Sequence, residues 1–144
     1  MIVVGLPGSG KSWWVDGHLA EFNGVVNADY FEDSLVPTFR FTDSRYYRPL
    51  IAALRAGQDC LIADIAFCDT LRRVEATQVL AFDAPGAQVR WVFFENNTEA
   101  CMANIKRDGG ARLLNRLRNF SLFAHKYHIP PGVEALPVWK PNTA

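Results

Sequence analysis

Residues 5 to 12 of the chain read GLPGSGKS and match the pattern G-x-x-x-x-G-K-[ST] at every position. Glycines in such a loop let successive backbone N–H groups point into one concave surface, which suits the oxygens of a phosphate. The lysine of this pattern, here Lys11, reaches the β- and γ-phosphates of a nucleotide, and the hydroxyl of Ser12 binds Mg²⁺. The loop therefore predicts a nucleoside triphosphate site, whose expected contacts are Gly5, Pro7, Gly8, Ser9, Gly10, Lys11, Ser12 and Trp13.

Two aspartates occur where short apolar runs of the sequence end. Asp29 follows the run 25–27, and Asp64 lies near the end of the run 60–65. A carboxylate beside a bound triphosphate can accept a proton from an attacking hydroxyl or help to hold a metal ion. Each aspartate also has a structural alternative, because Asp29 could belong to a turn and Asp64 could cap the loop above its strand. Both are candidate site residues.

Short apolar runs alternate with longer amphipathic segments along the whole chain. Strands are expected at 2–4, 25–27, 60–65, 89–94 and 136–139. Helices are expected at 11–22, 44–56, 71–82, 98–107 and 111–126, with Asp69 and Thr98 as caps of the third and fourth. This alternation predicts a single-domain, three-layer α/β fold with a mainly parallel sheet of about five strands. Ligands of such sheets bind beyond the carboxyl ends of the strands, where the glycine loop, Asp29 and Asp64 would meet.

Composition limits the kinds of partner that the protein can bind. The chain has 144 residues, of which 49% are hydrophobic, and its 15 basic side chains are balanced by 15 acidic ones. This length and this apolar content suit one domain with one core. Without net charge, any contact with nucleic acid needs a local basic patch. Three cysteines without metal-ligand spacing, and no apolar run long enough for a membrane span or a signal segment, predict a cytoplasmic protein that does not enter membranes.

Two features of the sequence narrow the chemistry at the phosphates. Water-activating ATPases commonly carry a glutamate after the aspartate of their second strand motif, whereas Asp64 is followed by Ile65. The guanine-reading motif N-K-x-D does not occur. Both features favour transfer of a phosphoryl group to a hydroxyl over hydrolysis.

Four segments of the chain, in this order, resemble the small P-loop kinases related to polynucleotide 5′-hydroxyl kinase. They are GLPGSGKSWW at the start, NADY at 27–30, IAD at 62–64 with Arg72 and Arg73 behind it, and CMANIKR at 101–107 before a basic helix. Together they span residues 2 to about 128, and the first is the most specific. The resemblance implies a P-loop NTPase fold, ATP and Mg²⁺ as cofactors, and transfer of the γ-phosphate to an alcohol.

The resemblance also implies roles for individual residues. Asp29 would be the general base toward the attacking hydroxyl, and Lys11 would bind the transferred phosphate. Asp64 would hold Mg²⁺ through water, together with Ser12, or would contact the acceptor hydroxyl. Trp13 is a departure from the family, because relatives often carry threonine there, whose hydroxyl can meet the α-phosphate. Trp13 could contact the nucleotide through its ring or its indole N–H instead.

Catalytic arginines are implied in a short helical lid at about 106–118. Gly109 and Gly110 provide a hinge there, and the family places arginines that correspond to Arg107 and Arg112. Arg116 follows Arg112 by four residues and would share its helix face. The alternative is that these arginines form only the solvated face of an amphipathic helix.

A second group of arginines alternates with aromatic residues over 37–48. Arg45 and Arg48 would share a helix face, and together with the rings they would suit a single-stranded nucleic-acid end or a nucleotide-like small molecule. The alternative is that Phe39, Phe41 and Tyr47 belong to the core while the arginines are exposed.

The sequence thus predicts one P-loop kinase domain over 1–144 that binds Mg²⁺·ATP. The first choice of acceptor is a nucleic-acid 5′-hydroxyl. Two alternatives remain: a small-molecule kinase acting on a nucleoside, sugar or antibiotic hydroxyl, and a nucleotide-binding regulator that transfers nothing.

Overall fold

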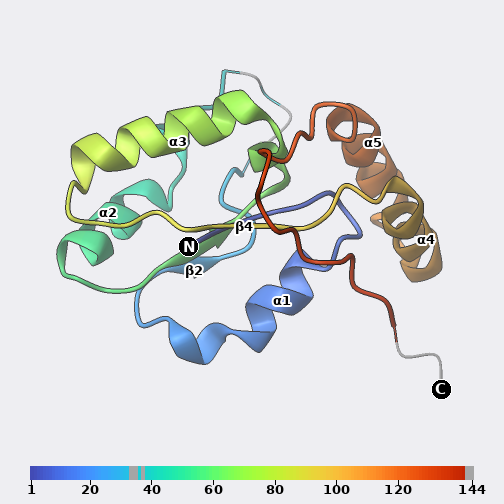
Figure 1. Ribbon diagram of the computed structural model, residues 1–144, viewed down its shortest axis with the longest axis horizontal. Helices are drawn as coiled ribbons and strands as arrows, with labels where there is room; N and C mark the ends of the chain where they lie inside the picture. Colours follow the sequence, from blue (N-terminus) through green and yellow to red (C-terminus); the bar gives the residue numbers. More distant parts are fainter. Residues whose placement is uncertain (33–35, 37, 142–144) are drawn as a thin grey trace.

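The computed structural model describes residues 1–32, 36 and 38–141, and its elements are drawn in Figure 1. Within these residues there are four strands, β1 (Ile2–Val4), β2 (Val26–Asn27), β3 (Leu61–Ala63) and β4 (Trp91–Phe93). The same part of the chain forms five α-helices, α1 (Lys11–Gly17), α2 (Tyr47–Arg55), α3 (Thr70–Asp83), α4 (Thr98–Asp108) and α5 (Leu113–Phe123). Short 3₁₀ helices occupy Leu19–Glu21, Phe41–Asp43 and Ile65–Cys68.

The four strands form one sheet in the order β2-β3-β1-β4, and every neighbouring pair is parallel. β1 lies inside this sheet, with Ile2 opposite Ile62 of β3 and opposite Trp91 of β4. The prediction of an α/β fold with a parallel sheet is therefore confirmed. Because all four strands point the same way, the loops that follow β1 and β2 leave the sheet at one edge, as the sequence predicts.

The segment 136–139, predicted as a fifth strand, forms no strand in the described chain. Leu136 instead makes a single parallel bridge to Phe94, donating its N–H to the carbonyl of Phe93 at 2.7 Å. Pro137 has no N–H with which to continue a ladder, and two residues later Trp139 donates to the carbonyl of Ser9. The chain thus leaves the sheet and packs on the glycine loop.

Alternate residues of β1 belong to two different hydrophobic clusters. Ile2 and Val4 pack with side chains of α2 and α3, among them Leu50 and Leu80, whereas Val3 packs with Val15 of α1. Figure 1 accordingly shows α2 and α3 on one side of the sheet and α1 on the other. This period-two pattern explains why the short central strand is apolar at every position, since both of its faces are covered.

Two helices begin or end away from their predicted bounds. The helix predicted at 11–22 ends at Gly17, because His18 leaves the helical conformation and its Nδ1 lies 2.6 Å from the carbonyl oxygen of Trp14. The helix predicted at 44–56 begins only at Tyr47. Ser44 is extended instead, and its hydroxyl donates to the carbonyl of Tyr30 at 2.7 Å.

The other three helices follow their predictions more closely. Asp69 caps α3 as predicted, accepting the N–H of Leu71 at 2.9 Å. The cap of α4 is Asn97 rather than the predicted Thr98, since its Oδ1 accepts the N–H of Ala100. The last helix spans Leu113–Phe123, shorter than the predicted 111–126. None of the helices in the described part of the chain is long and apolar enough to cross a membrane.

Candidate functional site

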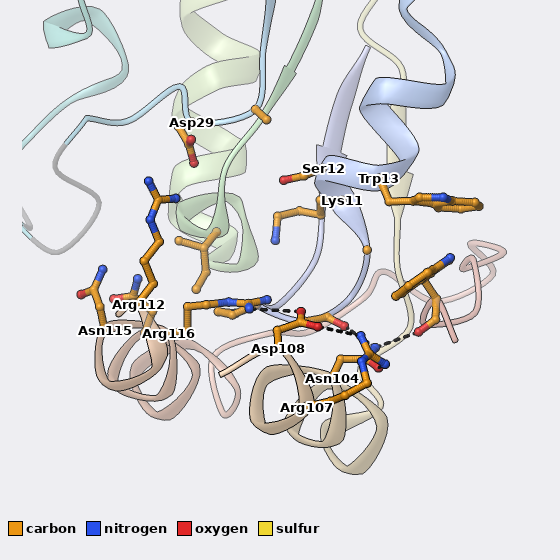
Figure 2. A pocket seen from close by; sticks show the side chains of 17 residues that line it. Lys11, Ser12, Trp13, Asp29, Asn104, Arg107, Asp108, Arg112, Asn115 and Arg116 are labelled. Carbon is orange, nitrogen blue, oxygen red and sulfur yellow. Dashed lines mark hydrogen bonds and ion pairs between the residues drawn. The ribbon is translucent and has the colours of Figure 1, made fainter. Parts of the chain in front are cut away.

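A cleft of about 580 Å³ lies between the loops after β1 and β2 on one side and α4 and α5 on the other. Figure 2 shows the side chains that line it. The lining residues are Pro7, Gly8, Gly10, Lys11, Ser12, Trp13, Ala28, Asp29, Ile65, Asn104, Arg107, Asp108, Arg112, Asn115, Arg116, Asn119 and Trp139. Most of the residues predicted from the glycine loop and the lid therefore meet in one place.

The glycine loop depends on glycine at two positions with positive φ, Gly8 at 81° and Gly10 at 103°. A Cβ on Gly10 would lie 2.6 Å from the Cβ of Trp139, and a Cβ on Gly8 would overlap the carbonyl of Cys101. The loop is thus pressed against α4 and the C-terminal segment. The backbone N–H groups of residues 10–13 have no acceptor among the described residues, so they remain available to an anion.

Asn104 holds the two sides of the cleft together. This side chain is only 6% exposed, and its Nδ2 donates to the carbonyl of Gly8 at 2.8 Å and to that of Trp139 at 2.7 Å. Its Oδ1 accepts from Arg107 at 2.9 Å. One amide from α4 therefore fixes the glycine loop, the C-terminal segment and Arg107, a role that sequence reasoning missed.

Lys11 lies in the cleft with its ammonium directed back at its own loop. Its Nζ donates to the carbonyl of Leu6 at 3.1 Å. Burial lowers the pKa of the Lys11 ammonium, while nearby acidic groups, including Cys68 and Asp64, oppose that shift. Beside it, the hydroxyl of Ser12 has no hydrogen-bond partner in the described chain. This hydroxyl is free to bind a ligand, and the Lys11 ammonium could do so by giving up its one bond to Leu6.

Asp29 is exposed on the cleft wall, directly after β2. Its backbone N–H donates to Oδ1 of Asn27 at 2.6 Å, which fixes the turn, whereas its carboxylate accepts no hydrogen bond from the described residues. Figure 2 shows Arg112 extending from the opposite wall toward this carboxylate. The backbone of Asp29 is therefore fixed by a hydrogen bond, whereas its carboxylate is free to bind a ligand.

Asp64, the second predicted carboxylate, does not line the cleft. It is 3% exposed, and its two oxygens accept the N–H groups of Ala66 at 2.9 Å and Phe31 at 2.8 Å. Burial raises the pKa of Asp64 to about 7, against the effect of those two N–H groups and of Lys11. This geometry is that of the predicted alternative, a carboxylate that caps the turn above its strand.

Three arginines of the segment predicted as a lid, Arg107, Arg112 and Arg116, line the cleft, and two of them share one counter-ion. Asp108 accepts from Arg107 at 2.9 Å through Oδ1 and from Arg116 at 3.3 Å through Oδ2 (Figure 2). These two guanidinium groups lower the pKa of the Asp108 carboxyl. Arg112 has no ion-pair partner in the described chain, which sets it apart from the other two.

We expect Asp108→Asn to bind ATP about two- to fivefold more tightly, because the phosphates no longer compete with a carboxylate for Arg107 and Arg116. Asp108 is 44% exposed, which keeps the effect small. Calorimetric titration at low and high salt measures it, and the gain should shrink as salt screens the charges. Glu99→Gln removes a charge from the same helix outside the cleft and should change nothing. Weaker binding in Asp108→Asn would mean that Asp108 orders the arginines rather than competing for them.

Two tryptophans from distant parts of the chain meet at one end of the cleft. The rings of Trp13 and Trp139 have centroids 5.9 Å apart at an interplanar angle of 37°, and the guanidinium of Arg107 lies 5.4 Å from the Trp139 ring centroid. Trp13 is 58% exposed despite its size. A tilted pair beside a cation, with one of its two rings exposed, suits the face of a planar aromatic ligand.

The other predicted substrate residues, Arg45 and Arg48, lie outside the cleft lining. Both are exposed, and Arg45 pairs with Glu32 at 3.8 Å and packs over the ring of Tyr46. Of the aromatic residues near them, Phe41 is fully buried, while Phe39 and Tyr47 pack against the main core. This arrangement matches the alternative of core rings with exposed arginines. Pro37, in the same stretch, lies outside the described residues.

Comparison with protein-family models gave no match to this chain, and comparison with curated proteins gave none either.

Proposed function

We propose that the protein is an ATP-dependent P-loop kinase that transfers the γ-phosphate of Mg²⁺·ATP to a hydroxyl, with a nucleic-acid 5′-hydroxyl as the first choice of acceptor. One observation carries the proposal. A single cleft brings together the glycine loop with Lys11, the unpaired carboxylate of Asp29 and the arginines of α4 and α5. Phosphoryl transfer needs these three kinds of group, namely a phosphate cradle, a proton acceptor and cations for the transferred charge.

The donor nucleotide would lie along the loop. The free N–H groups of residues 10–13 would bind phosphate oxygens, and Lys11 would exchange the carbonyl of Leu6 for the β- and γ-phosphates. The aromatic pair of Trp13 and Trp139 would take the nucleobase by stacking. Arg107 and Arg116 would exchange Asp108 for phosphate oxygens.

The residues present also fit Mg²⁺. This ion usually keeps several waters and binds through one or two protein groups and the substrate phosphates, so it needs no cage of side chains. The described residues contain no group of three or more histidine, cysteine or acidic side chains that could hold a metal ion, so a Mg²⁺ ion here would depend on the phosphates and on water. Ser12 would hold the ion through its free hydroxyl, and the ion would neutralise phosphate charge. Asp64 would act at most through water, because both of its oxygens accept backbone N–H groups.

Asp29 would act on the acceptor. The acceptor hydroxyl oxygen forms a bond to the γ-phosphorus, the bond from that phosphorus to the β–γ bridging oxygen breaks, and ADP leaves. The hydroxyl proton passes to the carboxylate of Asp29, whose oxygens are free of other hydrogen bonds in the described chain. Arg112, which points toward Asp29, would balance charge on the transferred group.

Transfer of labelled γ-phosphate to a panel of 5′-hydroxyl oligonucleotides, nucleosides, sugars and other small alcohols tests the proposal. We expect labelled oligonucleotides. Labelling of small alcohols alone would favour a small-molecule kinase, and ATP binding without any transfer would favour a regulator.

Lys11→Ala is expected to weaken ATP binding about 10- to 100-fold, because a charge-assisted hydrogen bond to phosphate is lost. Calorimetric titration with Mg²⁺·ATP measures the change. Lys106→Ala, which removes an exposed lysine of α4 outside the cleft, is the matched control and should bind as the wild type does. Equal affinity of Lys11→Ala and the wild type would contradict a triphosphate site in the loop.

A further inference from the structure

Two asparagines of α5, Asn115 and Asn119, line the cleft without an assigned role. They are four residues apart, so they lie on one helix face, which they share with Arg112 and Arg116. Asn115 is exposed and its side chain makes no hydrogen bond within the described residues. Oδ1 of Asn119 is buried and also accepts no hydrogen bond there. Buried acceptors in native proteins are nearly always paired with a protein group or a water, so this oxygen is available to a donor on a ligand.

The position of Asn115 separates it from the donor nucleotide. In Figure 2, Asn115 and Arg112 lie at the end of the cleft below Asp29, whereas Trp13 and Arg107 lie at the opposite end, and Lys11 lies between them. A nucleotide that stacks at the tryptophan end and places its phosphates at Lys11 leaves the Asp29 end to the acceptor. The free carboxamide of Asn115 therefore belongs to the acceptor's half of the cleft, and Asn119 lies one turn further along the same helix face.

The chemistry of the two side chains points to the part of the acceptor that they bind. A carboxamide offers a donor and an acceptor in one plane, which matches the edge of a nucleobase. Both carboxamides are neutral, so they suit a neutral polar group rather than a phosphate. A cationic acceptor such as an amino sugar is disfavoured, because Arg112, which has no counter-ion in the described chain, faces the same space.

We propose that Asn115 and Asn119 hydrogen-bond the base of the acceptor's terminal nucleoside and so make the enzyme select hydroxyl acceptors that carry a base, an inference that rests on the proposed kinase function. The 5′-hydroxyl of that nucleoside then lies at Asp29. The terminal base, rather than the length of the nucleic acid behind it, determines binding at this end.

A pair of oligonucleotides that differ only in the 5′-terminal residue, base-bearing or abasic, tests the proposal in the transfer assay. The wild type should show a KM about tenfold or more lower for the base-bearing acceptor, since without the base the exposed amide of Asn115 and the buried Oδ1 of Asn119 lose their partners. Asn115→Ala should raise the KM for that acceptor toward the abasic value while leaving the KM for ATP unchanged. Arg118→Ala, on the exposed side of α5, is the control. Asn119→Ala should act like Asn115→Ala, and circular dichroism verifies that each variant is folded.

Equilibrium binding separates this inference from the kinase function. Fluorescence anisotropy measures the same two oligonucleotides with Mg²⁺ and a non-hydrolysable ATP analogue. Base-dependent binding that Asn115→Ala removes, without any transfer, would support the subsite and refute the kinase. Transfer that is equal for both acceptors, or base preference that persists in folded Asn115→Ala, would overturn the subsite and leave the kinase intact. Failure to bind either oligonucleotide and to transfer to either would also overturn the subsite.

Discussion

Asp29→Asn is expected to lower the rate of phosphoryl transfer about 10²- to 10⁴-fold, the contribution of a positioned general base. The amide is close in shape to the carboxylate but cannot take the hydroxyl proton. The turn should survive, because it is fixed by the backbone N–H of Asp29 on Asn27 and not by the side chain. Single-turnover transfer of labelled γ-phosphate measures the rate, and calorimetry on the same preparation measures ATP affinity, which we expect to change by less than about twofold.

Asp16→Asn is the matched control for this experiment. Asp16 is an exposed aspartate of α1 that does not line the cleft, so its substitution removes the same charge without touching the site. Full transfer activity in Asp29→Asn would exclude Asp29 as the base. Loss of ATP binding together with transfer would instead mean that Asp29 shapes the nucleotide site.

The parts of the fold that depend on residues close together in the sequence could be predicted from the sequence. The apolar run of β1 leads directly into the glycine loop, and Asp69 caps α3, because each depends on residues that are close in sequence. The parallel sheet followed from the alternation of strands and helices, and that sheet brings Lys11 and Asp29 to one cleft. Arg107 and Arg112, which the family resemblance implied, line the same cleft.

The opposite wall of the cleft was not predictable from pattern. Asn104 holds Gly8 across 96 positions of sequence, and nothing about a single asparagine in an amphipathic helix marks it for that task. Trp139 was expected in a strand, but Pro137 ends the pairing and the tryptophan packs on the loop instead. Asp108 and Arg116 pair across Gly109 and Gly110, so their contact depends on how α4 and α5 meet.

Asp64 shows the limit of the rule that ligands bind beyond the ends of strands. The rule correctly predicted that Asp64 lies at this edge of the sheet. It did not predict that the carboxylate would lie outside the cleft lining. The 3₁₀ helix Ile65–Cys68 and the segment after Asp29 both present N–H groups to that carboxylate, and it satisfies them. The direction of the Asp64 carboxylate is thus set by the N–H groups near it. Those N–H groups come from two separate segments of the chain, so the sequence around Asp64 alone could not predict it.

Gly8→Ala is expected to destabilise the protein and to abolish tight ATP binding together. Its φ of 81° costs an L-residue about 1–2 kcal/mol, and the new Cβ would overlap the carbonyl of Cys101, so the loop must move away from α4. That movement would break the hydrogen bond from Asn104 to Gly8 and turn the N–H groups of residues 10–13 out of register. Denaturant unfolding measures the stability, and calorimetric titration measures the affinity for Mg²⁺·ATP.

Gly17→Ala is the matched control. It replaces a glycine whose backbone an alanine can adopt, and so shows whether the effect of Gly8→Ala comes from the positive φ and close packing of Gly8. Gly17 ends α1, its φ is not positive, and a Cβ there would meet nothing within 4 Å. Alanine is also the better helix former by up to about 1 kcal/mol, so the unfolding free energy should stay level or rise. ATP affinity should remain that of the wild type, because Gly17 does not line the cleft. If Gly8→Ala bound ATP normally, the nucleotide would not depend on the curvature of this loop, and the cleft would have to hold its ligand through Arg107, Arg112 and Arg116 alone.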